Sequence, residues 1–412
     1  MENTPFWGDA PTSRAPGRVY TDPEVYREEL ERFFYSGHWC YVGLECEIPN
    51  PGDFKRTVVG ERSVILVRDA GGEVRVVENR CAHRGVAFCR ERTGSVKSFT
   101  CPYHQWNYNL KGDLTGLPFR RGVKAEGGVQ GGMPADFKLE EHGLKQLQVA
   151  CRGGAVFASF DANVEPFEDF LGPEVLPFYD RVFSGRPLKL LGINRQRIPA
   201  NWKLMQENIK DPYHPGLLHT WFVTFGLWRA DQKSRMVMDA RHRHACMISR
   251  RNDGGAAAVT QGVTSFRADM QLNDPRLLDV VPEPWWNGPS VVMTTLFPSL
   301  IIQQQVNSLS TRHIQPAGPG QFDFVWTHFG FADDDEAMTQ RRLRQANLFG
   351  PAGFVSADDG EVIEFVQQAF EANPEARTVS ELDGRDVKPT DHMVTETLIR
   401  GMYGYWREVM GK

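Results

Sequence analysis

The sequence lacks the long apolar run that a membrane-spanning helix needs. Its 412 residues contain no uninterrupted apolar stretch of about 18 residues. The first residues, MENTPFWGDAPTSRAPGR, have no apolar core of the kind found in signal peptides. Low-complexity tracts and internal repeats are also absent. We therefore expect a globular cytoplasmic protein with no membrane partner.

An excess of positive charge and a disulfide framework are missing as well. The formal net charge is −5, so a broad basic surface is not expected and nucleic-acid binding is disfavoured. Five of the seven cysteines show no pairing pattern, which favours a reducing compartment. The other two cysteines lie in a pattern of a different kind.

Two cysteines and two histidines form the pattern C-A-H and, 17 residues later, C-P-Y-H. These residues are Cys81, His83, Cys101 and His104. Thiolate sulfur suits zinc and iron–sulfur sites, and imidazole binds zinc, copper, iron or nickel. A mixed set of this kind can hold a [2Fe–2S] cluster in which both cysteines bind one iron and both histidines bind the other. A structural zinc with the same four ligands is the alternative that the spacing alone leaves open.

A second metal motif lies in WKLMQENIKDPYHPGLLH, residues 202–219. His214 and His219 would lie about 140° apart on a straight α-helix, so a regular helix does not bring them together. Pro212 and Pro215 interrupt a helix at this point, and an unwound turn would allow both imidazoles to reach one metal. Two histidines and one carboxylate form the site of non-haem Fe(II) oxygenases, and Asp359 is the carboxylate that we favour.

Taken together, these motifs resemble those of the Rieske non-haem iron aromatic-ring hydroxylating oxygenases, large (α) subunit. C-x-H-x17-C-x2-H precedes E-N-x-x-D-x-Y-H-x4-H and then G-P-A-G-x4-D-D, and the similarity runs from about Asp22 to Met410. The resemblance implies that Asp359, the second Asp of the pair, binds the mononuclear iron. It also implies that Asp211 links an iron-ligand histidine to a cluster-ligand histidine of a neighbouring subunit.

Structural roles for the same acids remain open at this point. Ser356 and Asp359 also fit a capping pattern at a helix start. Asp358 fits a solvated acid in a first helical turn, and Asp211 fits a helix end. Asn208 and Tyr213, which flank the ligands, are either residues that orient the imidazoles or ordinary packing residues.

The pattern of apolar residues predicts an α+β fold with an N-terminal all-β part. Asp22 and Pro23 have the residue types of a helix start, and RSVILVRDA and GEVRVVENR alternate around Gly71–Gly72 as in a hairpin. The predicted catalytic part contains an antiparallel sheet with covering helices near 356–371 and 393–409. We expect three segments, which are an N-terminal arm and helix (1–37), a Rieske [2Fe–2S] domain (38–161) and a catalytic mononuclear iron domain (162–412).

The resemblance also implies an activity and partners. It is strongest for the salicylate 5-hydroxylase group, so the expected reaction converts salicylate to gentisate with O2. Electrons would come from NAD(P)H through a ferredoxin reductase and a ferredoxin. A head-to-tail homotrimeric ring, α3 or α3β3 with a small β subunit, is the implied assembly. Dioxygenases of anthranilate, benzoate or terephthalate are the first alternative, and a zinc-stabilised binding protein or a pure electron-transfer protein is the second.

An aromatic acid needs a partner for its carboxylate. A strand over 301–312 would place Gln303 and Gln305 on one face and Arg312 on the other. Arg312 suits a bidentate contact to a carboxylate. Gln305 and Ser356 are the alternative partners, for a carboxylate and an ortho hydroxyl. Met393 stands where a second cation would serve a dicarboxylate, which argues against such a substrate.

Overall fold

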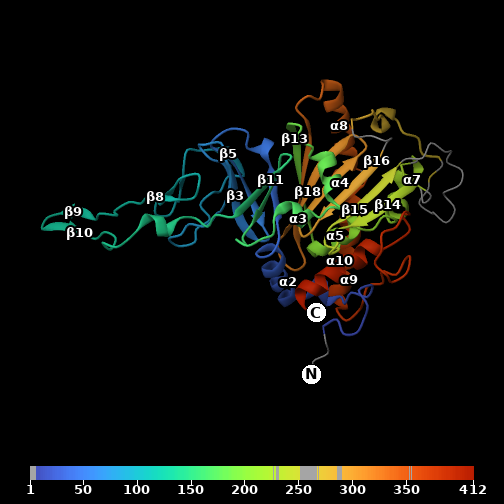
Figure 1. Cartoon of the computed structure of the whole chain (residues 1–412), viewed down its shortest axis with the longest axis horizontal. Coiled ribbons are helices and arrows are strands. Elements are labelled where there is room, and N and C mark those ends of the chain that lie inside the picture. Colours follow the sequence, from blue (N-terminus) through green and yellow to red (C-terminus); the bar gives the residue numbers. More distant parts are fainter. Residues whose placement is uncertain are drawn as a thin grey trace. The chain divides into compact units, whose positions relative to one another are not determined.

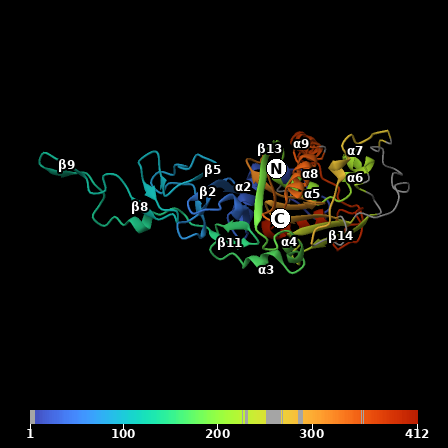
Figure 2. The same ribbon diagram turned by 90° about the horizontal axis from the view of Figure 1, so that it is seen from above.

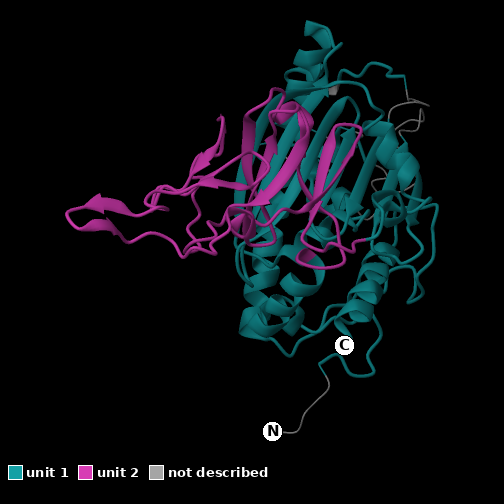
Figure 3. Cartoon of the chain, turned by 60° about the vertical axis from the view of Figure 1, so that its left-hand side comes forward, with its two compact units in different colours: residues 1–33, 165–412 teal, residues 34–164 magenta. Residues whose placement is uncertain are grey.

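The computed structural model describes residues 6–225, 227–228, 232–250, 267, 269–284, 290–351, 353 and 355–412. The first five residues of the expected arm, and two residues of the motif GPAGFVSADD, lie outside this set. The chain divides into two compact units, residues 34–164 and residues 1–33 with 165–412 (Figure 3). Within the described residues, no helix is long and apolar enough to span a membrane.

The unit of residues 34–164 consists of short antiparallel strands (Figure 1). Its sheets have the strand orders β4-β3-β2-β5, β6-β7-β8 and β1-β12-β11, and β9 pairs with β10. The strands are β1 (Cys40–Leu44), β2 (Asp53–Val59), β3 (Arg62–Arg68), β4 (Val74–Glu78), β5 (Thr93–Ser95), β6 (Phe99–Thr100), β7 (Asn107–Tyr108), β8 (Leu114–Gly116), β9 (Val123–Ala125), β10 (Gly128–Gln130), β11 (Gln148–Arg152) and β12 (Ala155–Ser159). Short 3₁₀ turns are η2 (Glu45–Glu47) and η3 (Leu139–His142).

The predicted hairpin around Gly71–Gly72 is confirmed, because β3 pairs with β4 in antiparallel register. Asp69 accepts the backbone N–H groups of Gly71 and Glu73 through Oδ1 at 2.8 and 3.0 Å. Gly72 has a φ of +87°, which glycine adopts without the steric cost of a side chain.

The other unit is built on one antiparallel sheet of seven strands in the order β13-β19-β18-β17-β16-β15-β14. Figure 2 labels the two edge strands, β13 and β14. Its strands are β13 (Leu188–Ile198), β14 (Lys233–Met238), β15 (Ala245–Arg250), β16 (Ser290–Leu296), β17 (Leu300–Gln305), β18 (Ser308–Pro316) and β19 (Phe322–Phe331). The expected fold class, an all-β Rieske part followed by an α+β part with an antiparallel sheet, is confirmed.

The expected single strand over 301–312 is wrong. Val306 adopts a φ of +48° and reverses the chain, so β17 and β18 are two strands of a hairpin. Gln303 pairs with Ser310 across this hairpin, and Ile301 pairs with Arg312. Since paired residues share a face of a sheet, Arg312 lies on the same face as Gln303 and Gln305, not on the opposite one.

Helices cover both faces of this sheet. They are α1 (Arg18–Thr21), α2 (Pro23–Glu29), α3 (Phe167–Leu171), α4 (Leu176–Val182), α5 (Trp202–Ile209), α6 (Pro215–Leu218), α7 (Thr220–Thr224), α8 (Glu336–Phe349), α9 (Ser356–Ala372) and α10 (Thr397–Met410), with a π-turn η1 (Leu30–Phe34) and a 3₁₀ turn η5 (Pro275–Leu278). On one face, α5 packs against β16 and β18, and α9 packs against α5. On the other, Arg181 of α4 donates to Gln304 Oε1 at 3.2 Å.

Capping side chains fix where several helices begin. Asp22 accepts the backbone N–H of Glu24 in front of α2, as the sequence predicts. Asn201 accepts the N–H of Lys203 at the start of α5. Asp335 caps α8 in the same way, and the run DDDEA there is a helix-start signal that our sequence analysis missed. At the N-terminus, the Trp7 ring packs 5.5 Å from Tyr403 of α10.

Candidate active site

Two loops with matching backbone geometry carry the first metal motif. In one loop, the N–H of Cys81 donates to the carbonyl of Val86, and the N–H of Gly85 donates back to the carbonyl of Cys81. In the other, Cys101 makes the same pair of hydrogen bonds with Trp106 and Gln105. Gly85 and Gln105 both have positive φ values, +71° and +54°. The two loops are therefore equivalent turns, each presenting one cysteine and one histidine.

The two cysteines of these loops are buried, whereas His83 and His104 are partly exposed. Cys81 and Cys101 are each 2% exposed. The hydroxyl of Tyr108 accepts the N–H of Ala82 at 3.1 Å and lies 3.2 Å from Cys81 Sγ, so its own proton can be donated to the sulfur. The His83 ring lies 4.6 Å from that of His104.

One atom of these four side chains is left without a partner. His104 Nδ1 is buried and has no hydrogen-bond partner in the described part of the chain. A single tetrahedral zinc would draw four ligand atoms to within about 4 Å of one another. Within the described residues, groups of three or more such atoms within 4.8 Å occur at one place only, and it is not these loops. The ligand atoms of these loops therefore do not form one such compact group.

The one such group within the described residues is His214, His219 and Asp359, and its two histidines lie at a break between helices. Helix α5 ends at Ile209, α6 begins only at Pro215, and His219 separates α6 from α7 with a non-helical ψ of +86°. The interruption expected from the prolines is thus present. Because of it, the His214 and His219 rings lie with centroids 5.5 Å apart although regular helical geometry would separate them.

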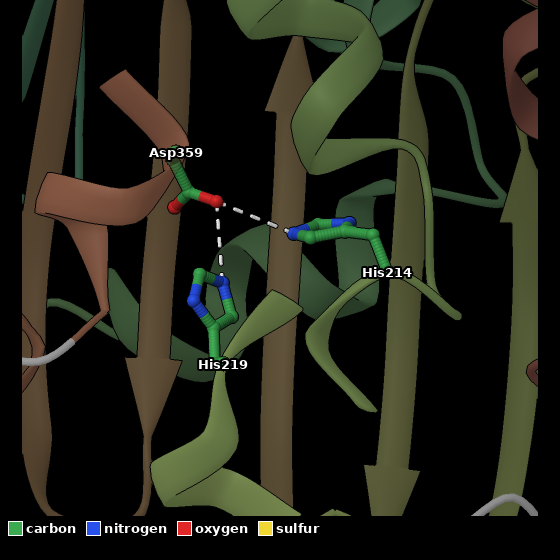
Figure 4. Close-up of side chains that lie close together, drawn as sticks. All are labelled: His214, His219 and Asp359. Atoms are coloured by element: carbon green, nitrogen blue, oxygen red, sulfur yellow. Dashed lines mark ion pairs between the residues drawn. The ribbon is translucent and has the colours of Figure 1, made fainter. Parts of the chain in front are cut away.

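Both imidazoles point at one carboxylate oxygen (Figure 4). Oδ1 of Asp359, in the first turn of α9, lies 3.4 Å from His214 Nε2 and 3.2 Å from His219 Nε2. Asn208 Nδ2 donates to the same oxygen at 3.1 Å. His219 and Asp359 are buried, and His214 is partly exposed. Two histidines and one carboxylate on one side of a site form the facial arrangement of non-haem Fe(II) centres.

The opposite nitrogens of the two rings are held by acceptors. His214 Nδ1 lies 2.8 Å from the backbone carbonyl of Asp211, and His219 Nδ1 lies 3.1 Å from Asp358 Oδ2. A carbonyl and a carboxylate accept only, so each Nδ1 carries the proton and each Nε2 keeps its lone pair. The two Nε2 atoms are therefore prepared as metal ligands.

The electrostatics favour a positive charge between these residues. Burial alone would lower the pKa of His214, but hydrogen bonds to Asp211 and Asp359 raise it to about 10. Burial would raise the pKa of Asp359, yet the two imidazoles hold it well below its usual range. A cation bound here would replace the proton that the imidazoles otherwise share with Asp359.

The three residues open into a cavity of about 630 Å3, including its mouth. Alternate residues of β15, β16 and β17 form its floor, among them Met247, Val291 and Met293. The walls are mostly apolar, and the polar groups other than the triad are Asn208, Ser249, Gln305 and Arg312. A mostly apolar pocket with a few converging polar groups is typical of a small-molecule site.

Arg312 brings a buried positive charge to this cavity. Its side chain is 2% exposed and stacks 3.9 Å over the Trp326 ring. Burial lowers the pKa of Arg312 to about 9, so the guanidinium is still charged at neutral pH. Among the described residues, no carboxylate lies within ion-pair distance of it. Ser356, the other expected partner, has a buried hydroxyl without a hydrogen bond but does not line the cavity.

Comparisons with known proteins agree with this geometry. Residues 38–126 match the Rieske [2Fe-2S] domain family, and residues 180–412 match the ring hydroxylating alpha subunit (catalytic domain) family. The chain is 71% identical to the salicylate 5-hydroxylase large oxygenase component of Ralstonia sp., over 99% of this chain and 97% of that protein. The chain belongs to the Rieske ring-hydroxylating oxygenases, alpha subunit.

More distant relatives agree in fold. The anthranilate 1,2-dioxygenase large subunit of Burkholderia cepacia is 40% identical over 97% of this chain and 94% of its own length. The crystal structure of naphthalene 1,2-dioxygenase from Rhodococcus sp. bound to indole has a TM-score of 0.80 at 23% identity. That match covers 96% of this chain and 94% of that chain.

Membership of this family decides the metal content. The protein is a ring-hydroxylating oxygenase with a Rieske [2Fe–2S] cluster and a mononuclear iron. The zinc-stabilised binding protein, which the spacing of the first motif left open, is therefore wrong. The paired turns and the unpartnered His104 Nδ1 fit the cluster, and the triad of His214, His219 and Asp359 fits the single iron.

Some residues near the iron site have roles that differ from expectation. Asp358 is a partly exposed acid in the first turn of α9, as expected, but its carboxylate also lies 3.1 Å from His219 Nδ1. The Tyr213 hydroxyl donates to Glu396 Oε1 at 3.3 Å, and Asn208 Nδ2 donates to the carboxylate of the triad. Within the described residues, neither side chain forms a hydrogen bond to an imidazole. Helix α9 begins at Ser356 without a side-chain cap, so the capping alternative for Ser356 and Asp359 is wrong.

Proposed function

We propose that this chain is the large oxygenase component of an enzyme that hydroxylates salicylate at carbon 5 and forms gentisate. The observation that carries the proposal is the buried Arg312, the one arginine or lysine among the described residues that line the apolar cavity beside the iron site. A buried guanidinium without a carboxylate within ion-pair distance is costly, and the carboxylate of an aromatic monoacid would supply that partner. The 71% identity to the Ralstonia protein supports the same substrate.

The overall reaction needs two electrons. Salicylate, O2, two electrons and two protons give gentisate and water, so one oxygen atom enters the ring and the other leaves as water. The mononuclear iron, when bound, supplies O2 activation, and the Rieske cluster supplies electrons one at a time. The protein must hold the ring, keep bulk water away and orient the metal ligands.

We assign the metal sites as follows. Cys81, His83, Cys101 and His104 hold the cluster, and His214, His219 and Asp359 hold the mononuclear iron. Asp211 acts by hydrogen bonding to a neighbouring subunit, as the family resemblance implies. Asn208 is proposed to orient Asp359. The domain limits that we propose are 38–161 for the cluster domain and 162–412 for the catalytic domain, with 1–37 as arm and helix.

Two features of the cavity favour a monoacid with an ortho hydroxyl. Arg312 would bind the carboxylate and Gln305 the hydroxyl oxygen, both from the sheet. Carbon 5 lies para to the hydroxyl, so a ring held by these two groups has carbon 5 on its far edge. Met393 lines the cavity where a dicarboxylate would need a second cation. Ser356, one residue from the cavity-lining Val355, is a further partner for the acid if α9 moves.

The proposed partners are a ferredoxin, an NAD(P)H-dependent ferredoxin reductase and a small β subunit. We propose a ring of three α chains, because the family resemblance implies electron transfer between the cluster of one subunit and the iron of the next. A head-to-tail interface of this kind forms a closed ring only at a defined rotation.

Product analysis tests the function. The complete system of oxygenase, ferredoxin, reductase and NADH is given salicylate, anthranilate, benzoate or terephthalate in turn. The expected result is gentisate from salicylate, with a single labelled atom when 18O2 is used. Catechol from anthranilate or a cis-diol from benzoate, with salicylate untouched, would instead identify a dioxygenase.

A further inference from the structure

A chain of three polar side chains crosses the sheet floor below the cavity. Arg312 Nε donates to Gln303 Oε1 at 2.8 Å, and Arg312 Nη2 donates to the same oxygen. Gln303 Nε2 then donates to Gln305 Oε1 at 2.7 Å. Arg312 and Gln305 line the cavity, whereas Gln303 is fully buried and does not. The hairpin of β17 and β18 brings all three to one face.

The direction of this chain follows from chemistry alone. A guanidinium has donors and no acceptor, so the atom of Gln303 that faces Arg312 is its oxygen. The other end of the same amide is then a donor, and the atom of Gln305 that faces it is an oxygen. Gln305 is left with its NH2 group. Within the described residues, that nitrogen has no hydrogen-bond partner, and it belongs to a side chain that lines the cavity.

We propose that Gln303 is a positioning residue that sets substrate specificity, by locking Gln305 as a donor toward the ortho substituent of the aromatic acid. This inference rests on the function proposed above. Arg312 and Gln305 then offer only N–H groups to the cavity. An ortho group that accepts a hydrogen bond is favoured, and one that presents N–H groups is rejected.

Salicylate and anthranilate differ in this property. The phenol O–H of salicylate donates to its own carboxylate and leaves oxygen lone pairs for Gln305. The amino group of anthranilate also donates to the carboxylate, but its second N–H points outward and its nitrogen is a poor acceptor. Two donors would then face each other. Leaving a buried donor unpaired should weaken anthranilate binding about tenfold or more relative to salicylate.

Replacing Gln303 by glutamate should reverse the orientation of the Gln305 amide. In Gln303→Glu both side-chain oxygens accept, so one binds Arg312 and the other takes the NH2 of Gln305. The Gln305 amide flips and presents its oxygen to the cavity. Both acids lose affinity because the new carboxylate competes for Arg312. The ratio of the two affinities should move toward anthranilate by about tenfold or more.

A matched control lies on the same strand. Gln304→Glu makes the same chemical change on the opposite face, where Arg181 donates to Gln304 Oε1 at 3.2 Å. That variant should leave the ratio unchanged. Gln303→Met keeps the volume but cannot orient Gln305. Gln303→Met should bring the ratio of salicylate to anthranilate affinity near one. It tests the inference if Gln303→Glu does not fold.

The measurement is equilibrium binding of salicylate, anthranilate and benzoate to the oxidised holoenzyme by calorimetry, without turnover. Benzoate, which lacks the ortho group, gives the reference for the carboxylate contact. A ratio that moves toward anthranilate in Gln303→Glu, or falls to near one in Gln303→Met, supports the inference. If salicylate binds and the ratio of salicylate to anthranilate affinity is the same in the wild type and both variants, the inference about Gln303 is wrong and the proposed function still stands. Failure of the wild type to bind any of the three acids overturns the proposed function as well.

Discussion

The carboxylate of Asp358 lies 3.1 Å from His219 Nδ1, while the carboxylate of its neighbour Asp359 faces Nε2 of the same ring. Two consecutive acids of one helical turn thus hold opposite sides of one imidazole. One side is where a metal binds, and the other fixes the tautomer that makes this binding possible.

Substitutions of Asp358 and Asp359 should therefore differ in their effect on binding of the mononuclear iron. Asp358→Ala is expected to weaken iron binding by roughly 10- to 100-fold while excess Fe(II) restores it, because the ligand remains but loses its orientation. Asp359→Ala should lose the mononuclear iron even in excess Fe(II). Iron content and the visible spectrum measure both centres, and the Rieske spectrum should be intact in each variant. Loss of iron in Asp358→Ala alone would reverse the assignment.

Asp211 is expected to act through its charge. Its Oδ1 accepts the backbone N–H groups of Tyr213 and His214 at 3.0 and 3.1 Å, and an asparagine would keep both hydrogen bonds. Asp211→Asn should therefore retain both metal centres but lose most turnover, since the proposed link between subunits needs the carboxylate. Asp211→Ala should also loosen the turn that carries His214. Single-turnover oxidation of the reduced cluster, with substrate and O2, is the assay, and near-normal oxidation in Asp211→Asn would leave only the structural role.

Gly216 allows Trp228 to close the turn between the two histidines. A Cβ added at Gly216 would overlap the Trp228 ring, whose Nε1 donates to the carbonyl of Pro212 at 3.2 Å. Gly216→Ala should displace this ring, which lines the cavity, and destabilise the protein by about 1–3 kcal/mol. Gly404→Ala in α10 meets nothing within 4 Å and should be neutral or stabilising. Thermal unfolding and salicylate affinity compare the two, and equal effects would exclude the packing explanation.

The sequence predicted the chemistry of the site better than its surroundings. The ligands could be recognised because metal binding restricts residue types and spacing, and the prolines revealed the break beside His214. The reversal at Val306 could not be recognised, since Val306-Asn307 carries no glycine signal. Distant contacts hold that turn: the Asn307 side chain donates to the carbonyl of Val281 and to Glu283 Oε1, and its backbone N–H donates to Gln345 Oε1. The role of Asp358 likewise depends on how α9 is oriented, which no local pattern states.

Glu207 should make stability depend on pH. Burial raises the pKa of Glu207 to about 7, although hydroxyl donation from Tyr403 and Tyr20 lowers it in part. The folded protein then holds a proton that the unfolded chain releases near pH 4.5. The contribution of Glu207 to the free energy of unfolding therefore falls as pH rises from about 4.5 to about 7. In the wild type the free energy of unfolding should fall by on the order of 3 kcal/mol across that pH window, and Glu207→Gln should remove this fall. Melting temperatures at pH 5 and 7.5 test this against the exposed Glu24→Gln, which should keep the wild-type slope.

Four basic side chains near the cluster loops should steer a negatively charged ferredoxin. Arg84, Arg90, Arg92 and Lys97 are exposed, and in the described residues none of them forms an ion pair. Since long-range attraction of this kind is screened by salt, reduction of the cluster by ferredoxin should slow as ionic strength rises. Arg90→Glu with Arg92→Glu should slow it at low salt and flatten that dependence. Lys111→Glu with Lys124→Glu, at exposed positions outside the two cluster loops, makes the same charge change and should have a smaller effect. A rate that is independent of salt in the wild type, or equal loss in both double variants, would show that these four residues do not form the docking surface.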